Sequence, residues 1–215
     1  VNESDIVIFA VKPQVMKTAV LPLAEGLSEK KPLLISIAAG IPISSLESWA
    51  GDYLAIVRAM PNTPALINAG ITALFANSRV VPEQRNQAAS ILRAVGKVVW
   101  VEEETLMDTV TAVSGSGPAY FFYFMEALEQ AAIEEGLDEN TARLLTLETA
   151  LGAARLAIET TASPSELRGQ VTSPGGTTEA AIQVLEQAGM SQILKLAVTA
   201  ARKRSADLAD SSSTD

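Results

Sequence analysis

The pattern of apolar residues changes once along this chain, near residue 102. Before this point, short apolar runs such as residues 5–11 and 33–38 alternate with segments that have helical spacing. Continuous β-branched runs of this length are typical of strands buried on both faces of a parallel sheet. After residue 102 only helical spacing follows. We therefore expect an α/β Rossmann-like parallel sheet over residues 1–102 and an all-α domain over residues 103–215.

The expected helices after residue 102 carry more apolar surface than a domain of roughly 110 residues can bury alone. The run Tyr120–Met125 is apolar all round, which is typical of a helix covered on every side. We expect these helices to form a homodimer, and a self-contained bundle is the alternative. The polar tail at residues 210–215 is expected to be disordered.

The composition narrows the chemistry that the chain can perform. It has a formal net charge of −9, which argues against nucleic acid or an anionic membrane as partner. It contains no cysteine and no histidine, so thiolate or histidine catalysis is excluded, and no metal site is expected. This favours a reaction in which a cofactor carries the chemistry. No apolar run reaches the roughly 18 residues of a membrane span, and we expect a cytoplasmic protein.

Three small-residue loops follow expected strands, at the ends where parallel sheets bind ligands. They are Ala10–Pro13, Ala38–Gly40 and Met60–Pro64. Small residues let a flat ring approach the backbone, and Asn62 can both donate to and accept from an amide. Each loop alone has the composition of an ordinary turn, and Lys12 alone is typical of a solvated strand end. Together the three loops favour a cofactor site, in which Lys12 has a binding role.

The segment from Val171 to Thr178, which we call the glycine loop, runs directly into a helical pattern that begins at Glu179. Its hydroxyls, its two glycine N–H groups and the helix N-terminus predict an anion site. A phosphate and a carboxylate fit equally well by physics alone, and Glu179 disfavours the phosphate dianion more. The alternative is an ordinary helix cap, but a cap needs only one hydroxyl.

A second glycine segment, Ser114–Tyr120, lies between two helical patterns. Its glycines predict a sharp turn with close packing, and Ser116 is a candidate cap for the next helix. By itself this segment indicates only tight packing of two helix ends. With the glycine loop it suggests a shared pocket wall. A complete G-x-G-x-x-G motif does not occur in the sequence.

The four motifs Ala10–Gln14, Met60–Pro64, Ser114–Tyr120 and Val171–Thr178, in this order and spacing, resemble the Δ1-pyrroline-5-carboxylate reductase family. The resemblance covers essentially the whole chain. It implies a Rossmann domain followed by a helical dimerisation domain. Members of that family begin with a Gly-rich β-α-β unit of about 50 residues that has no counterpart here. We therefore expect an N-terminally incomplete sheet, and a 215-residue chain that is inactive alone.

The resemblance implies NAD(P)H-dependent reduction of 1-pyrroline-5-carboxylate to L-proline, with NADPH or NADH as cofactor and a homodimer, or a higher oligomer of dimers, as assembly. The expected cofactor-binding residues, including Asn62 from the strand-end loops, are Ala10, Val11, Lys12, Pro13, Ile37, Ala38, Ala39 and Asn62. The expected substrate-binding residues are Glu104, Gln170, Val171, Ser173, Gly175, Gly176, Thr177 and Thr178. Thr178 is the candidate catalytic residue, through a hydrogen bond to the ring nitrogen.

The sequence leaves two other functions open. One is a non-catalytic dimeric homologue that kept the helical domain. The other is a different two-domain Rossmann dehydrogenase, such as one for β-hydroxyacids. Those enzymes usually bring a lysine from the helical domain onto the substrate, whereas Lys195 and Lys203 lie beside no glycine loop here. The choice between NADP and NAD is also left open.

Overall fold

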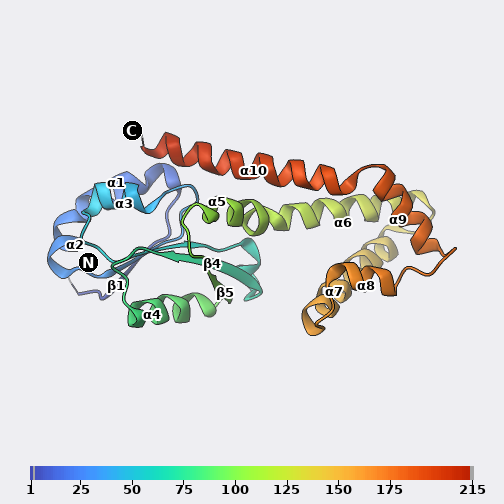
Figure 1. The fold of residues 1–215 in the computed structure, drawn as a ribbon, viewed down its shortest axis with the longest axis horizontal. Coiled ribbons are helices and arrows are strands. Elements are labelled where there is room, and N and C mark those ends of the chain that lie inside the picture. Colours follow the sequence, from blue (N-terminus) through green and yellow to red (C-terminus); the bar gives the residue numbers. More distant parts are fainter. Residues whose placement is uncertain (2, 214–215) are drawn as a thin grey trace. The chain divides into compact units, whose positions relative to one another are not determined.

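The computed structural model describes the backbone of residues 1 and 3–213, with side chains up to residue 209 (Figure 1). These residues form two compact units. One consists of Val1–Pro118 together with Ala197–Asp215, and the other of Ala119–Leu196. The last helix thus contributes to both units.

The first unit contains a five-stranded sheet with its strands in chain order. The strands are β1 (Ile6–Phe9), β2 (Leu33–Ser36), β3 (Ile56–Met60), β4 (Gly70–Ala76) and β5 (Gly96–Trp100). Strands β1 to β3 are parallel, as predicted. Strand β4 is antiparallel to β3 and parallel to β5, so the expectation of a wholly parallel sheet is corrected there. Only a short 3-10 turn, η3 (Thr63–Ile67), connects β3 to β4, whereas a parallel crossover needs about a dozen residues or more.

Helices cover both faces of this sheet (Figure 1). One face, with Leu34 and Ile56, packs against α1 (Met16–Val20), α2 (Ala24–Lys30) and α3 (Ile43–Ala50). The other face, with Ile35 and Val57, packs against α4 (Pro82–Arg93). The 3-10 turn η2 (Leu21–Leu23) separates α1 from α2, because Pro22 has no N–H to continue the helix.

The segment at Ser114–Gly117 is not the sharp turn that its glycines predict. After α5 (Leu106–Val110), a π-helical turn, η4 (Thr111–Gly115), leads into α6 (Gly117–Glu134). Ser116 N donates to Thr111 O at 2.8 Å, and Ser116 has helical backbone angles instead of those of a cap. A Cβ on Gly115 would lie 2.5 Å from Met60 Cε, so the close packing expected from this glycine is present. π-Turns of this kind are frequent at functional sites.

The second unit is entirely helical. It contains most of α6, then α7 (Glu139–Glu159), α8 (Pro164–Gln170), α9 (Thr177–Gln187) and the start of α10 (Met190–Ser213). Side chains cap the N-termini of α7 and α8. Asp138 Oδ1 accepts from Thr141 N at 3.1 Å. Ser163 and Glu166 form a reciprocal capping box, with distances of 3.3 and 2.6 Å.

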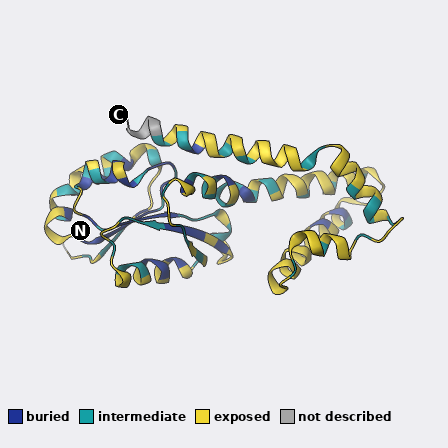
Figure 2. Ribbon diagram, viewed as in Figure 1, coloured by how far each residue is buried: buried dark blue, intermediate teal, exposed yellow. Residues whose placement is uncertain are grey.

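Much of the helical unit is exposed in a single chain (Figure 2), and large apolar residues are among the exposed ones. Phe121, Phe122 and Tyr123 on α6 are 68%, 63% and 74% exposed. An exposed apolar run of this size is typical of an interaction surface, as the predicted homodimer requires. In the part of the chain that the structure describes, no helix is long and apolar enough to cross a bilayer.

The tail expected at residues 210–215 begins within α10. The helix continues to Ser213, because extending an existing helix needs no new nucleus. Residues 214 and 215 lie outside the described residues.

Candidate active site

The carboxyl ends of β1 and β2 bring two of the predicted cofactor loops together. Phe9 at the end of β1 is paired with Ser36 at the end of β2, and Ile37 N donates to Phe9 O at 3.1 Å. Residues 10–13, the first rim loop, and residues 37–42, the second rim loop, therefore leave the same edge of the sheet side by side. The residues predicted there from Ala10 to Pro13 and from Ile37 to Ala39 are neighbours in the structure.

The first rim loop presents a cation at this edge. Lys12 is exposed, and its ammonium has no ion-pair partner among the described residues. Its carbonyl oxygen accepts from Val15 N at 3.1 Å, which starts the 3-10 turn η1 (Pro13–Val15). Pro13 at the first position of that turn fixes the backbone after Lys12. The lysine is thus held at the strand end by backbone geometry while its side chain stays available to an anion.

Asn62 follows β3, the third parallel strand, and so lies beyond the same edge. Its side chain, however, is used within the chain, because Oδ1 accepts from Ile71 N at 3.0 Å. This hydrogen bond ties the residue after β3 to the beginning of β4. Only the amide nitrogen of Asn62 remains for a ligand among the described contacts.

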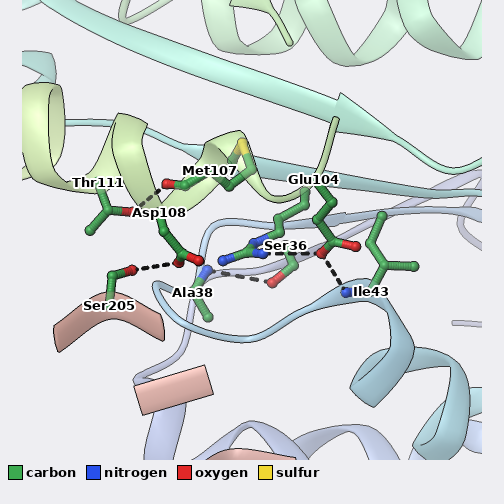
Figure 3. Close-up of polar contacts among 9 residues, drawn as sticks. Ser36, Ala38, Ile43, Glu104, Met107, Asp108, Thr111 and Ser205 are labelled. Atoms are coloured by element: carbon green, nitrogen blue, oxygen red, sulfur yellow. Dashed lines mark hydrogen bonds and ion pairs between the residues drawn. The ribbon is translucent and has the colours of Figure 1, made fainter. Parts of the chain in front are cut away.

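Glu104 lies in a polar cluster on the sheet face that carries α3 (Figure 3). Its Oε1 accepts from Arg58 Nη1 at 3.0 Å and from the backbone N–H of Ile43 at 2.8 Å. The Arg58 side chain is only 6% exposed, and that of Glu104 is 27% exposed. Glu104 therefore joins β3 to the start of α3. No role was predicted for Arg58, although a lone arginine at the end of an apolar strand signals a buried partner.

The C-terminal part of α10 contacts both the second rim loop and α5. Ser205 is buried, and its Oγ donates to Asp108 Oδ1 at 2.8 Å (Figure 3). Gly40 has a φ of +71°, and a Cβ there would lie 3.3 Å from Leu208 Cβ. Glycine at position 40 thus satisfies both a left-handed backbone and a close approach of the helix. Sequence reasoning missed this contact because it joins residues far apart in the chain.

In the helical unit, the glycine loop forms a tight turn before α9. Gly176 N donates to Ser173 O at 3.0 Å, and Gly175 adopts a φ of +70°. Gly175 N donates to Glu179 Oε2 at 2.7 Å. Both glycine N–H groups are therefore used inside the loop, which differs from the expectation that they are offered to a ligand. A Cβ on Gly176 would lie 2.6 Å from Ser173 Oγ, so the turn leaves no room for a side chain there.

The donors that remain come from the first turn of α9. Its N-cap is Gly176, which has no capping side chain, and the N–H groups of Thr177 and Thr178 have no intrahelical acceptor by helix geometry. Thr178 is half-buried, whereas Thr177 and Ser173 are exposed. An anion can accept from these N–H groups and from the three hydroxyls at the positive end of the helix dipole.

The residues before the glycine loop fix where α8 ends. Gln170 is the last residue of α8, and Val171 follows it as the C-cap and is 62% exposed. Thr172 Oγ1 donates to Arg168 O at 2.6 Å, and Thr172 N donates to Gly169 O at 3.2 Å. Thr172 thus closes the helix, which leaves Gln170 and Val171 exposed beside the loop.

A family model described as "Pyrroline-5-carboxylate reductase dimerisation" matches residues 104–208. Among curated proteins, the chain is similar to pyrroline-5-carboxylate reductase of Pseudomonas aeruginosa. The two are 49% identical over 210 residues, which are 98% of this chain and 77% of that protein.

Two solved structures resemble the chain closely. A pyrroline-5-carboxylate reductase from Coxiella burnetii is 50% identical with a TM-score of 0.92, covering 96% of this chain and 77% of that one. A pyrroline carboxylate reductase from Plasmodium falciparum with NADP bound is 31% identical with a TM-score of 0.89, covering 97% of this chain and 78% of that one.

Proposed function

The chain belongs to the pyrroline-5-carboxylate reductase family, which reduces 1-pyrroline-5-carboxylate to L-proline with NAD(P)H, and we propose how its residues divide this work. The observation that carries the function is the 49% identity over 98% of the chain. The reaction belongs to proline biosynthesis and is a reduction of a C=N bond. The roles given below to single residues are proposals.

The rim loops fit a nicotinamide cofactor. Ala10 and Ala39 carry only a Cβ and are not buried, so a flat ring can approach the backbone of both loops, whereas the predicted Ala38 is buried in the core beside them. The exposed ammonium of Lys12 suits the negative charge of a dinucleotide. We assign Val11, Pro13, Ile37 and the free amide nitrogen of Asn62 to the same site. When bound, the cofactor supplies the hydride.

The glycine loop fits the substrate. We assign the substrate carboxylate to the N–H groups of Thr177 and Thr178, with Ser173, Gln170 and Val171 beside it. The two glycines serve by shaping the turn, since their N–H groups are occupied within the loop. Glu104 is the proposed substrate-binding residue outside this loop.

Thr178 is proposed to accept a hydrogen bond from the protonated ring nitrogen and so to orient the imine. A protonated imine is already electrophilic. When hydride adds to its carbon, the electron pair of the C=N bond moves to nitrogen and leaves a neutral amine. No strong base is required, which agrees with a chain that has no histidine. The tasks of the protein are orientation and charge complementarity.

The family model and the homologues support a homodimer. Beyond that, we propose a higher oligomer of dimers, a cytoplasmic location and a functional division into residues 1–102 and 103–215. Light scattering and cell fractionation test the first two of these. Separate expression of the two segments tests the third.

The assay is NADPH oxidation with 1-pyrroline-5-carboxylate, on protein expressed from the complete reading frame. We expect Thr178→Ala to lower kcat/KM by about 10- to 100-fold through loss of an orienting hydrogen bond, with an unchanged Tm. Thr178→Ser should retain most activity because it keeps the hydroxyl. Thr160→Ala is the matched control, since the Thr160 hydroxyl only bonds Leu156 O within α7. An unchanged kcat/KM in Thr178→Ala removes Thr178 from the site.

A further inference from the structure

Arg58 is the only buried charged residue in the part of the chain that the structure describes, at 5% exposed. It lies on β3, paired in register with Ser36 at the end of β2. A guanidinium in such a place is strongly destabilising unless a partner neutralises it. The partner is Glu104, whose Oε1 lies 3.0 Å from Arg58 Nη1. Arg58 therefore requires Glu104 as its partner, and the pair lies next to the strand ends from which the rim loops leave.

The same carboxylate oxygen also caps the N-terminus of α3. That helix begins at Ile43 after Pro42, and no side chain of its own caps it. Glu104 Oε1 accepts from Ile43 N at 2.8 Å across 61 positions of the sequence. A carboxylate at this position satisfies one free N–H and complements the helix dipole. Glu104 is thus a remote cap for α3, and Arg58 holds the cap in place.

Ile43 directly follows the second rim loop, residues 37–42. The loop is fixed at its beginning by two hydrogen bonds, from Ile37 N to Phe9 O at 3.1 Å and from Ala38 N to Ser36 Oγ at 3.4 Å. Its end is fixed by the bond from Ile43 N to Glu104. With both ends held, the loop keeps its place at the sheet edge. Release of the end would allow the loop to relax around Gly40, which already has the left-handed φ that only glycine adopts easily.

We propose that Arg58 is a positioning residue for cofactor binding: through Glu104 it holds the start of α3 and thereby the second rim loop. The inference rests on the assignment of this loop to the cofactor made above. Arg58 touches neither cofactor nor substrate. Its effect passes through one carboxylate oxygen that receives both the guanidinium and the Ile43 N–H.

A purely structural ion pair would behave differently from a positioning residue. Loss of a structural pair lowers Tm and the fraction of folded enzyme, but it leaves the affinity of the folded molecules for each ligand unchanged. Loss of a positioning residue raises the Kd for the cofactor in the folded molecules. This rise is present without substrate, so it is separate from any effect of Glu104 on substrate binding.

The experiment compares Arg58→Lys, Arg58→Gln and the control Arg79→Gln, in protein from the complete reading frame. Arg79 also pairs with a residue of α3, because its Nη1 lies 2.9 Å from Glu47 Oε1. Unlike Arg58, its side chain is 41% exposed. Arg79→Gln thus removes an arginine that is paired with the same helix without touching the rim. Arg58→Lys keeps the charge and the fold, and it is the informative variant if Arg58→Gln does not fold.

The readouts are the Kd for NADPH from fluorescence titration, the two KM values, and amide hydrogen exchange across residues 37–43. We expect the Kd to rise about threefold to tenfold in Arg58→Lys, and at least about tenfold in folded Arg58→Gln, as is typical for loss of a residue that orients a binding group. Exchange at the Ile43 N–H should accelerate even without cofactor. Because Glu104 is also assigned to the substrate, the deciding value is the Kd for NADPH measured in the absence of 1-pyrroline-5-carboxylate. Arg79→Gln should match the wild type in all of these.

An unchanged Kd in Arg58→Lys with unchanged exchange at Ile43 overturns the inference. A rise confined to the KM for 1-pyrroline-5-carboxylate also overturns it, because Arg58 would then act on the substrate. Both outcomes leave the proposed function standing. If the wild-type protein itself binds neither NADPH nor NADH, the proposed function fails instead.

Discussion

The Glu179 carboxylate folds back onto the loop that precedes its own helix, where its Oε2 accepts from Gly175 N at 2.7 Å. This places a negative charge beside the first turn of α9, to which we assign the substrate carboxylate. The contact has two opposing effects. Its hydrogen bond holds the glycine loop in shape, whereas its charge repels an incoming anion. Two substitutions separate these effects.

Glu179→Gln keeps an oxygen that can accept from Gly175 N and removes the charge. We expect the KM for 1-pyrroline-5-carboxylate to fall by about twofold to fivefold, because surface-type charge repulsion is worth up to about 1 kcal/mol. Glu179→Ala removes the acceptor as well. The glycine loop then loses the hydrogen bond from Gly175 N that holds its shape, so the KM should rise. Steady-state kinetics at low and high salt measure both. The gain in Glu179→Gln should shrink with salt, since screening already weakens the repulsion in the wild type.

Glu135→Gln provides the control for this pair, because it removes an exposed carboxylate between α6 and α7. It should leave the KM unchanged. Equal KM values in wild type, Glu179→Gln and Glu179→Ala would show that the contact has no part in substrate binding.

The exposed aromatic run on α6 predicts the effect of a charge on the dimer. Tyr123→Glu should raise the dimer dissociation constant by at least about tenfold, because a buried unpaired carboxylate is costly and aromatic residues commonly dominate interfaces. Sedimentation equilibrium measures this constant. Gln87→Glu, on the exposed face of α4, adds the same charge and should leave the dimer intact. A dimer of unchanged affinity in Tyr123→Glu would place the interface elsewhere.

Gly96 at the start of β5 should tolerate no side chain. Its φ is +148°, and a Cβ would overlap the carbonyl oxygen of Gly70 on the neighbouring strand. We expect Gly96→Ala to lower the free energy of unfolding by about 3 kcal/mol or more. Gly152 lies in the middle of α7, where an added Cβ would meet nothing within 4 Å, so Gly152→Ala should raise stability by about 0.5–1 kcal/mol. Urea denaturation checks both, and a stable Gly96→Ala would contradict the tight β4–β5 pairing.

Two helix caps make stability depend on pH in the acidic range. Hydrogen bonds from the Ser163 N–H and hydroxyl lower the pKa of Glu166 below its ordinary value of 4.5. Hydrogen bonds from Thr141 lower the pKa of Asp138 below 3.8. For a lowered pKa, the stabilisation is fully present above the ordinary value and is lost as the pH falls through the folded value. These caps should therefore contribute nothing to the pH dependence above about pH 5.

An NMR titration of the side-chain carboxyls measures this directly. Ser163→Ala removes the hydroxyl and should move the pKa of Glu166 back toward 4.5, while the pKa of Asp138 stays lowered. A pKa of Glu166 that does not move would show that the backbone N–H alone is responsible.

Local patterns were sufficient for much of the fold. Strands β1 to β3, the caps at Asp138 and Ser163 and the change from mixed to helical structure follow from periodicity and capping chemistry, which involve residues close in sequence. The reversal of β4 was not predicted, because it depends on the short connection after Met60 forming a single turn. The π-turn at Thr111–Gly115 was also missed, since glycines there serve packing against Met60 instead of a reversal of the chain.

For the proposed site, the sequence by itself determined which loops are the candidates, because small residues, hydroxyls and strand ends are visible in the order of the residues. The tertiary structure decided which polar atoms in those loops remain available. Glu179 occupies the Gly175 N–H, Asn62 holds Ile71, and Arg58 binds Glu104. A hydrogen bond satisfies its donor wherever the partner lies in the sequence, and folding chooses that partner by distance in space. The sequence thus showed which chemical groups the candidate loops contain. It did not show which of these groups already have a hydrogen-bond partner within the chain.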